Sequence, residues 1–449
     1  MGHTAAAVPV VSIAPKKIFR FVVDPPRTYH GIGVQKERGD AASVMQFPIR
    51  RVIIEHVRPE IDGGRFPIKR TPDEIVEVTA DIYADGNDVL GARLLHRPKS
   101  QSDWSVAPMQ EIVNDAWTGE FRIASQERHL YTIQAWPDPF KSWVRDLKKR
   151  ADAAQELSIE FLIGAELIAA AASRAKLVSI DSEALHQFAR NLRDYHKTDS
   201  TKAFETAQSP ELALLMDRYP DLSAATLYER ELVVEVDRAR ARFGAWYEMF
   251  PRSCTDDSAR HGTFQSCIER LDYVAAMGFD VLYLPPIHPI GDFERKGKNN
   301  SVERTPEDVG SPWAIGSSLG GHTAIHPRLG SLEDFKKLIA EAKDRGLELA
   351  LDLAFQCAPD HPYVREHPEW FRIRPDGSVQ CAENPPKKYQ DIFPLNFESE
   401  HAQALCEELK SVALYWIRQG IRIFRVDNPH TKPFAFWEWL IGELRAEFP

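Results

Sequence analysis

Strand-like and helix-like hydrophobic patterns alternate four times between residue 243 and the end of the chain. The strand-like runs are residues 246–250, 281–284, 348–353 and 421–426, and the helix-like runs that follow them are 264–277, 332–345, 401–419 and 434–448. Because regular strand–helix repeats build parallel sheets, residues 241–449 are predicted to form an α/β region. Long loops with polar clusters follow the second and third strands, as in barrel enzymes. We therefore predict the first half of a (β/α)8 TIM barrel.

A different pattern fills the region before this repeat. Short β-rich runs lie at residues 52–56, 75–83, 92–96, 120–123 and 130–136. Turn signals such as Gly63-Gly64 and Asp85-Gly86 separate them, which is typical of two packed antiparallel sheets. Residues 46–140 are therefore predicted to form a β-sandwich domain of the immunoglobulin or fibronectin kind. Residues 1–45 show no sustained periodicity and are interpreted as a loose N-terminal extension.

Between these two regions the hydrophobic spacing is helical. Helices are predicted at residues 143–155, 159–175, 182–195 and 203–219. Ser182 is expected to be an N-cap, because a serine oxygen accepts from the free N–H groups of a first turn. Residues 141–240 are therefore predicted to form a helical insertion domain.

Composition excludes several classes of partner. The net charge of −10 leaves no basic face for nucleic acid, and 43% hydrophobic with 27% charged residues is a soluble globular balance. The most apolar stretch, residues 159–172, is too short to span a bilayer and contains Glu160 and Glu166. We therefore expect neither a nucleic acid nor a membrane as a partner.

The cysteines and the N-terminus point to a cytoplasmic protein. Five cysteines form an odd set without a C-x-x-C spacing, which favours neither a disulfide framework nor a zinc site. The first residues lack the basic cluster and apolar core of an export signal. No metal and no organic cofactor is expected.

The segment Gly420-Ile-Arg-Ile-Phe-Arg-Val-Asp-Asn-Pro-His430 carries the most specific chemical signal. It places Asp427 where an apolar strand meets its loop, the position of catalytic residues in barrels. A retaining reaction at a sugar needs a carboxylate that attacks the anomeric carbon. Arg425 is expected to keep Asp427 ionised, and Asn428 to donate hydrogen bonds to substrate. The simpler alternative is a structural ion pair between Arg425 and Asp427.

Several further motifs accompany this segment. They are Trp246-Tyr-Glu-Met-Phe-Pro-Arg-Ser253, Met277-Gly-Phe-Asp-Val-Leu-Tyr-Leu-Pro-Pro-Ile-His-Pro-Ile-Gly291, Lys296-Gly297 with Asn299-Asn300, Pro312-Trp-Ala-Ile-Gly316, Gly320-Gly-His322, Asp352-Leu-Ala-Phe-Gln-Cys-Ala-Pro-Asp-His-Pro362 and Ala382-Glu-Asn-Pro-Pro-Lys-Lys-Tyr-Gln-Asp391. Together they resemble glycoside hydrolase family 13, and more narrowly its maltose-1-phosphate maltosyltransferase branch. Amylases usually have Asn-His where this chain has Gln356 and Cys357, and that departure matches the maltosyltransferase branch.

The resemblance implies an activity and a set of site residues. The family branch transfers maltosyl units from α-maltose 1-phosphate to the non-reducing 4-hydroxyl of α-1,4-glucans such as glycogen, by a retaining double displacement. Asp427 matches its nucleophile. The residues that match its donor-binding positions are Lys296, Gln356, Asp391 and Asn428, with Asn384, Lys387 and Tyr389 expected on the phosphate side. Its upstream sandwich and helical parts also match, and they imply a homodimer, whereas residues 1–45 lie outside the resemblance.

Three of the candidate features have simpler interpretations. Lys387-Lys388 is equally the pattern of a solvated loop pair, although two loops bearing lysines suit a dianionic leaving group. His322 is expected to hydrogen-bond sugar hydroxyls, whereas His361 fits a satisfied structural histidine better. Trp313 lies in a site loop, where its ring either stacks on a sugar or anchors the core.

A retaining mechanism also needs a second carboxyl group about 5 Å from the first. The family places it at the end of the next strand, and one strand–helix–strand step takes about 30 residues. That count puts the general acid beyond Pro449, so we expect the given sequence to be a fragment without its proton donor.

Three functions therefore remain open from the sequence. The first is maltosyl transfer from α-maltose 1-phosphate. The second is hydrolysis of α-glucans through the same covalent intermediate, with water as the acceptor. The third is a glucan-binding or scaffolding protein without catalysis. Dependence of turnover on phosphate separates the first two, and binding without turnover favours the third.

Overall fold

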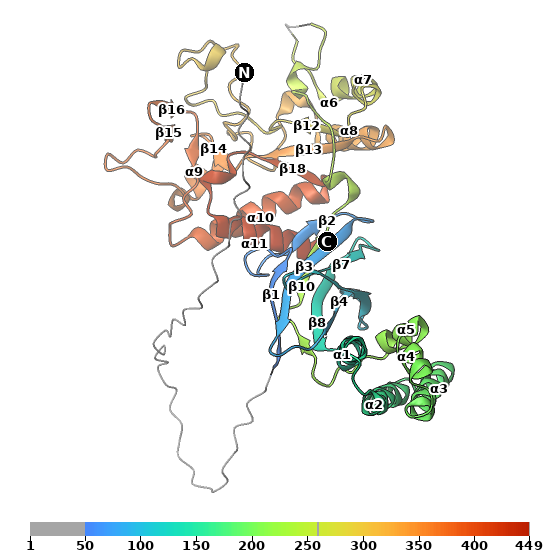
Figure 1. Ribbon diagram of the computed structural model, residues 1–449. Coiled ribbons are helices and arrows are strands. Elements are labelled where there is room, and N and C mark those ends of the chain that lie inside the picture. The colour runs from blue at the N-terminus through green and yellow to red at the C-terminus, as the bar shows by residue number, and fades with distance from the viewer. Residues whose placement is uncertain (1–49, 258–259, 449) are drawn as a thin grey trace, which may run out of the picture. The chain divides into compact units, whose positions relative to one another are not determined.

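The computed structural model describes residues 50–257 and 260–448 (Figure 1). Within them, a two-sheet part, a helical part and an α/β part follow one another along the chain. The extension predicted at residues 1–45 lies outside the described residues.

Two sheets share one hydrophobic core in the first part. The first sheet has the order β1 (Val52–Arg58), β3 (Ile75–Ala84), β7 (Ala116–Arg122) and β6 (Gln110–Val113). The second has the order β2 (Ile68–Arg70), β10 (Leu232–Val236), β8 (His129–Pro137), β4 (Leu90–Pro98) and β5 (Ser105–Pro108), with β9 (Thr226–Leu227) beside β8. Alternate residues of both sheets, such as Val76 and Val78 of β3 and Tyr131 and Ile133 of β8, are buried together. Such alternation of buried residues is expected where two sheets pack face to face, as in the predicted β-sandwich.

Strands β9 and β10 lie within residues 141–240, which were predicted to form a helical domain. Thr226 and Leu227 pair with β8, and Leu232–Val236 pair with β8 on one side and β2 on the other. The chain therefore leaves the second sheet after β8, forms the helices, and returns to the same sheet. Because β8 lies about 100 residues earlier in the chain, the sequence of residues 226–236 alone does not predict which strand they pair with.

The helical part consists of five helices among the described residues. They are α1 (Pro139–Asp152), α2 (Ser158–Arg174), α3 (Ser179–Tyr195), α4 (Ser200–Ala207) and α5 (Pro210–Arg218). Asp138 caps α1 by accepting from the Lys141 backbone N–H at 2.9 Å. The predicted helix over 203–219 is divided at Ser209, which caps α5 and is followed by Pro210 at its first position.

The expected N-cap at Ser182 is wrong. Helix α3 begins at Ser179, and the N-cap position is Val178. Ser182 lies one turn inside, where its hydroxyl donates to the Ala172 carbonyl of α2 at 2.9 Å. The serine therefore joins two helices, a contact that residue spacing does not predict.

The α/β part is built on four parallel strands. Their order is β11 (Trp246–Glu248), β12 (Val281–Leu284), β13 (Glu348–Leu353) and β18 (Ile423–Val426), the same as in the chain. The helices between and after them are α6 (Phe264–Ile268), α7 (Leu271–Ala276), α8 (Leu332–Asp344), α10 (Ala402–Arg418) and α11 (Phe434–Glu447). Parallel strands in chain order, each followed by a helix, agree with the predicted α/β fold and with part of a TIM-barrel sheet.

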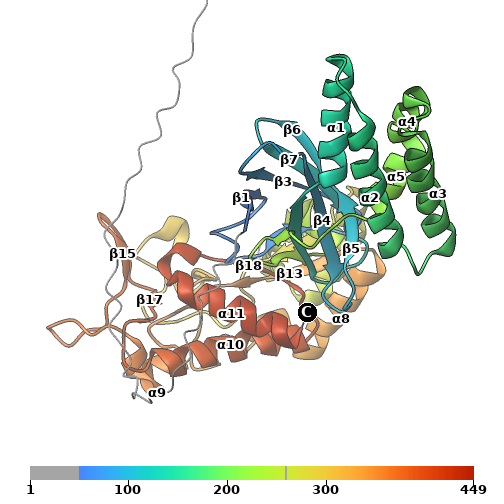
Figure 2. The same ribbon diagram turned by 60° about the horizontal axis from the view of Figure 1, so that its bottom comes forward.

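Each face of this sheet has its own buried residues. Leu282 and Leu284 of β12 pack with the helices in the largest core cluster, whereas Val281 and Tyr283 pack with residues of the neighbouring strands on the other face. Helices α10 and α11 lie side by side (Figures 1 and 2). Because all four strands run the same way, the carboxyl ends of β12, β13 and β18 meet at one edge.

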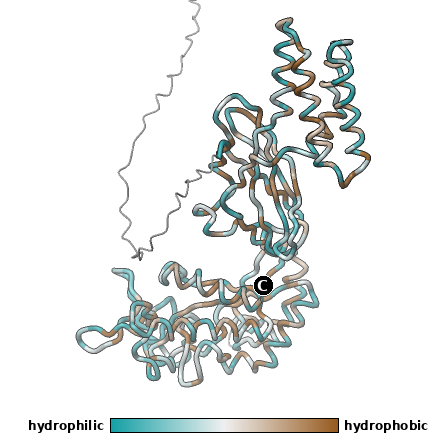
Figure 3. Tube along the Cα trace, turned by 90° about the horizontal axis from the view of Figure 1, so that it is seen from below, coloured by the Kyte–Doolittle hydropathy of each residue, from teal (hydrophilic) through white to brown (hydrophobic). Residues whose placement is uncertain are grey.

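Long loops follow β12 and β13 at that edge. The short elements within them are η3 (Lys298–Asn300), η4 (Pro327–Leu329), β14 (Gln356–Cys357), α9 (Pro362–Glu366), η5 (Pro368–Trp370), β15 (Ala382–Asn384), β16 (Lys387–Tyr389) and β17 (Phe393–Pro394), and η1 (Ala239–Ala241), η2 (Pro251–Ser253) and η6 (Pro429–Thr431) lie elsewhere. Figure 3 shows hydrophilic residues interspersed along the helices, and no helix in the described ranges is long and apolar enough for a bilayer.

Candidate active site

Strand β18 carries the predicted nucleophile to the edge of the sheet. The Asp427 backbone N–H donates to the Leu353 carbonyl at 3.1 Å, which extends the pairing with β13 by one rung. The chain then turns at Asn428, whose φ of 46° lies in the left-handed region that asparagine tolerates. The strand thus ends directly after Asp427, and its carboxylate projects from the edge.

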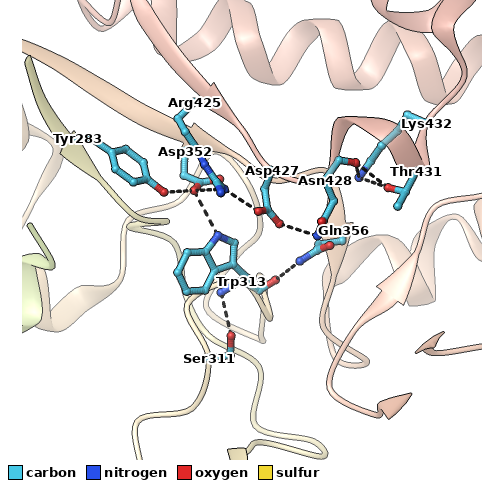
Figure 4. Close-up of polar contacts among 10 residues, drawn as sticks. All are labelled: Tyr283, Ser311, Trp313, Asp352, Gln356, Arg425, Asp427, Asn428, Thr431 and Lys432. Atoms are coloured by element: carbon cyan, nitrogen blue, oxygen red, sulfur yellow. Dashed lines mark hydrogen bonds and ion pairs between the residues drawn. The ribbon is translucent and has the colours of Figure 1, made fainter. Parts of the chain in front are cut away.

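Two neighbours hold the Asp427 carboxylate (Figure 4). Arg425 donates from Nη1 to Oδ1 at 2.6 Å, and Asn428 donates from Nδ2 to Oδ2 at 3.0 Å. The Asp427 side chain is 14% exposed, so it is largely shielded from water and yet accessible. One charged and one neutral donor thus fix the orientation of the carboxylate.

Asp352, at the end of β13, lies on the other side of the same arginine. Its Oδ2 accepts from Arg425 Nη1 at 3.2 Å, from Trp313 Nε1 at 3.2 Å and from the Tyr283 hydroxyl. Burial raises the pKa of Asp352 to about 6, and the Tyr283 hydrogen bond and the Arg425 charge oppose that shift. Sequence reasoning noted Asp352 only as the start of a motif. The structure makes it part of the nucleophile's surroundings.

A cavity of about 580 Å³ opens beside Asp427. The predicted site residues that line it are Gln356, Asn384, Tyr389, Asp391, Asp427 and Asn428. Gln356 donates to the Trp313 carbonyl at 3.1 Å, and Trp313 also lines the cavity. The structure therefore brings six of the ten candidate residues together in one hollow, from the ends of β13 and β18 and from the β15–β16 hairpin.

Asp391 presents an oxygen that has no partner among the described residues. Its side chain is buried, and no described donor reaches Oδ1. Burial raises the pKa of Asp391, and the charge of Lys296 opposes that shift. An unpartnered buried acceptor in a cavity wall suits a sugar hydroxyl, because leaving it unpaired is costly.

Four candidates do not line this cavity. Arg425 stands behind Asp427, and Lys296 is buried and donates to Gln390, next to Asp391. Lys387 is exposed on β16. His322 is buried at 3% exposure, where Nε2 lies 3.0 Å from the Ala354 carbonyl and Nδ1 lies 3.1 Å from Nε2 of His361. Both ring nitrogens of His322 are thus engaged away from the cavity.

His322, Cys357 and His361 form a cluster whose spacing would suit a metal ion. The hydrogen bonds do not fit one. The Tyr363 backbone N–H donates to Nδ1 of His361 at 3.0 Å, so Nε2 of that neutral ring carries the proton and donates to His322. A hydrogen-bond chain from the Tyr363 backbone through His361 and His322 to the Ala354 carbonyl thus accounts for both histidines.

Lys432 is a cavity residue that sequence reasoning missed. It is buried, lines the cavity, and donates to Thr431 Oγ1 at 2.9 Å and to the Asn428 carbonyl at 3.4 Å. Burial lowers its pKa to about 8, and the charge of Asp427 opposes that shift. The available signal was its place five residues after the nucleophile, in the same polar run.

Comparison with known proteins shows which family the chain resembles. Residues 50–238 match the family described as "Alpha-1,4-glucan:maltose-1-phosphate maltosyltransferase, domain N/S", and residues 248–393 match "Alpha amylase, catalytic domain". A protein of Cereibacter sphaeroides named α-1,4-glucan:maltose-1-phosphate maltosyltransferase is 45% identical over 410 residues, which cover 90% of this chain and 67% of that protein. The chain belongs to the α-1,4-glucan:maltose-1-phosphate maltosyltransferase family.

Other maltosyltransferases of this family agree. The Chlorobaculum tepidum protein of that name is 50% identical over 400 residues, which cover 89% of this chain and 59% of the relative. The chain likewise spans 60% of the Myxococcus xanthus maltosyltransferase, at 48% identity. Among solved structures, an α-amylase from Lactobacillus plantarum is 29% identical over 46% of this chain and 43% of that chain, with a TM-score of 0.38.

Proposed function

We propose that this chain forms the donor-binding part of an enzyme that transfers maltosyl units from α-maltose 1-phosphate to the non-reducing 4-hydroxyl of α-1,4-glucans such as glycogen. The observation that carries the proposal is the Asp427 carboxylate, held by Arg425 and Asn428 at the wall of the 580 Å³ cavity. Family membership supplies the reaction class, and the cavity supplies a place for a sugar phosphate.

The proposed reaction has two displacements. An oxygen of Asp427 attacks the anomeric carbon, the bond from that carbon to the phosphate oxygen breaks, and phosphate leaves. The 4-hydroxyl of a glucan then attacks the same carbon and releases Asp427, while its proton passes to the second carboxyl group that retaining enzymes use. In the proposal Asp391 accepts from donor hydroxyls, with Lys296 keeping Asp391 in place. Gln356 and Asn428 hold the same sugar.

Phosphate binding is proposed for the β15–β16 hairpin and Lys432. Asn384 and Tyr389 line the cavity, and Lys432 adds a buried cation on the β18 side. A dianionic phosphate favours such a combination of charged and neutral donors. Lys387 is exposed on β16 and does not line the cavity.

The primary test is donor binding, because the chain spans 59% of the Chlorobaculum tepidum relative. Calorimetry with α-maltose 1-phosphate should give saturable binding, and D391N should weaken it about tenfold through loss of a charged acceptor. D376N is the matched control, since Asp376 is outside the cavity and its Oδ1 binds Ser378. Absence of saturable binding by the parent chain would refute the proposal.

Turnover separates the remaining possibilities. With glycogen and donor, transferase activity releases phosphate and lengthens the glucan, whereas a hydrolase releases maltose without glycogen. D427A should abolish any product that the parent chain forms and should retain donor binding. Mass spectrometry of the parent after donor addition should find a maltosyl ester on the peptide that contains Asp427. Phosphate release by D427A at the parent rate would exclude Asp427 as the nucleophile.

We also propose a homodimer, which the family resemblance implies, and a cytoplasmic location, which the cysteine set favours. Light scattering during gel filtration should give twice the chain mass, and a monomer at micromolar concentration would refute the dimer.

A further inference from the structure

A second cavity, of about 180 Å³, shares no lining residue with the one at Asp427. It lies among the segments that follow β11 and β12. Arg252, Arg295 and Arg328 line it together with His261 and His326. Three guanidinium groups around one small hollow require either acidic partners or an anionic occupant.

Arg252 has no acidic partner among the described residues. Its guanidinium is partly buried, donates to the Gly310 carbonyl at 3.4 Å and lies 5.6 Å from the centre of the Phe250 ring. Burial lowers the pKa of Arg252, and no charge offsets that shift. A desolvated guanidinium with most of its N–H groups unused is a strong anion ligand.

The other two arginines differ in how firmly they are held. Arg295 donates to the Gly291 carbonyl at 2.7 Å and to the Ile290 carbonyl at 3.1 Å, and it forms an ion pair with Asp292, so its position is fixed and its charge is partly balanced. Arg328 is exposed, and its side chain makes no hydrogen bond or ion pair with a described residue. All three arginines contribute to the low pKa of His326, about 4, after burial and the neighbouring His261. The charges of all three arginines therefore act on the His326 ring.

Two carboxyl groups also line the cavity and offset part of its positive charge. Asp308 Oδ2 accepts from the Thr305 backbone N–H at 2.7 Å and from its hydroxyl at 3.1 Å. Glu307 is exposed at the rim. The interior of the cavity thus presents arginine donors, with Pro286, Ile290 and Leu329 on its apolar side.

We propose that this second cavity binds a small anion through a phosphate or carboxylate group held by Arg252 and Arg328. A planar guanidinium matches two oxygens of either group, and the apolar wall takes a short carbon body. Phe250 lines this cavity and packs edge-on against Trp313, at 6.1 Å between ring centres, and Trp313 donates to Asp352. The Phe250–Trp313 pair therefore connects the proposed anion site with Asp352, beside the nucleophile.

The test is calorimetric titration of the full chain with inorganic phosphate and, separately, with malonate. Saturable binding is expected for at least one of them, and R252M and R328M should each weaken it about tenfold or more, the loss of a charge-assisted hydrogen bond. R304M is the matched control, because exposed Arg304 lies on the same loop and does not line the cavity. The stronger of the two probes identifies phosphate or carboxylate as the preferred group.

The cavity at Asp427 is also expected to hold phosphate. Y389F, which changes a residue lining that cavity, is therefore titrated in parallel. If R252M and R328M bind both anions as tightly as R304M, or if the parent binds neither, the proposal is overturned. Loss of all phosphate binding in Y389F alone overturns it equally, because the anion then occupies the cavity at Asp427. R328M keeps the test valid if R252M does not fold, since the Arg328 side chain makes no hydrogen bond or ion pair with a described residue.

Discussion

The Nη1 atom of Arg425 lies 2.6 Å from Oδ1 of Asp427 and also 3.2 Å from Oδ2 of Asp352. One guanidinium nitrogen therefore separates two carboxyl groups that β18 and β13 bring to the same edge of the sheet. Without that cation the two carboxyl groups would face each other, and like charges raise the cost of ionising both. The Asp427 charge raises the pKa of Asp352, and the Arg425 charge between them lowers it.

Replacing Arg425 by methionine should slow phosphate release from α-maltose 1-phosphate about 10- to 100-fold, because a charge-assisted hydrogen bond to the nucleophile is lost. R422M is the matched control, since Arg422 precedes the same strand and its Nη1 donates only to the Ile417 and Ile421 carbonyls. Initial rates at saturating donor measure the effect. Equal rates for R425M and R422M would show that Arg425 has no role in the reaction.

The free energy of unfolding should depend on the titration of Asp352. Its folded-state pKa of about 6 lies above the usual value of 3.8, so the neutral form is favoured on folding. That contribution is fully present below about pH 4 and is lost as the pH rises through about 6, with an upper limit of about 3 kcal/mol. Urea titrations of the parent and of D352N between pH 4 and 7 isolate it. The difference between the two free energies should change across this range, and parallel curves would exclude the shift.

Lys432 should make donor binding sensitive to alkaline pH. Its pKa of about 8 means that the ammonium is charged at pH 7 and loses its proton as the pH rises above 8. K432M should bind α-maltose 1-phosphate about tenfold more weakly at pH 7. K432R should keep the affinity and remove its decline above pH 8, because arginine does not titrate there. Calorimetry from pH 6.5 to 9.5 tests both variants. A parent affinity that stays constant over this range would exclude a role for the Lys432 charge.

Local patterns predicted the elements that position the site. The apolar run before Asp427 predicts β18, and the polar residues after it predict a strand end. The β15–β16 hairpin lies within the motif at residues 382–391, but no strands were predicted there. Strand β18 depends on neighbours in sequence, so its residues themselves contain the information.

Contacts between distant segments were not predictable in the same way. Arg425 and Asp352 are 73 residues apart, and β10 pairs with a strand about 100 residues earlier. His322 has the residue type of a sugar ligand, yet its neighbours Ala354 and His361 come from another loop and occupy both ring nitrogens. Only the folded chain shows which polar groups already have partners.

His361 joins the loop after β13 to the loop after β12, where it contacts Gly321 and His322. A Cβ on Gly321 would lie 2.3 Å from Nε2 of His361, so G321A should force that ring out of its hydrogen bond with His322. Overpacking of this kind lowers the free energy of unfolding by about 1–3 kcal/mol. G442A is the matched control, because a Cβ on Gly442 in α11 meets no atom within 4 Å. Alanine there should stabilise the helix by about 0.5–1 kcal/mol. A lower urea midpoint for G321A and a higher one for G442A, each relative to the parent, would verify that His361 holds the two loops together. Equal midpoints for G321A and the parent would show that it does not.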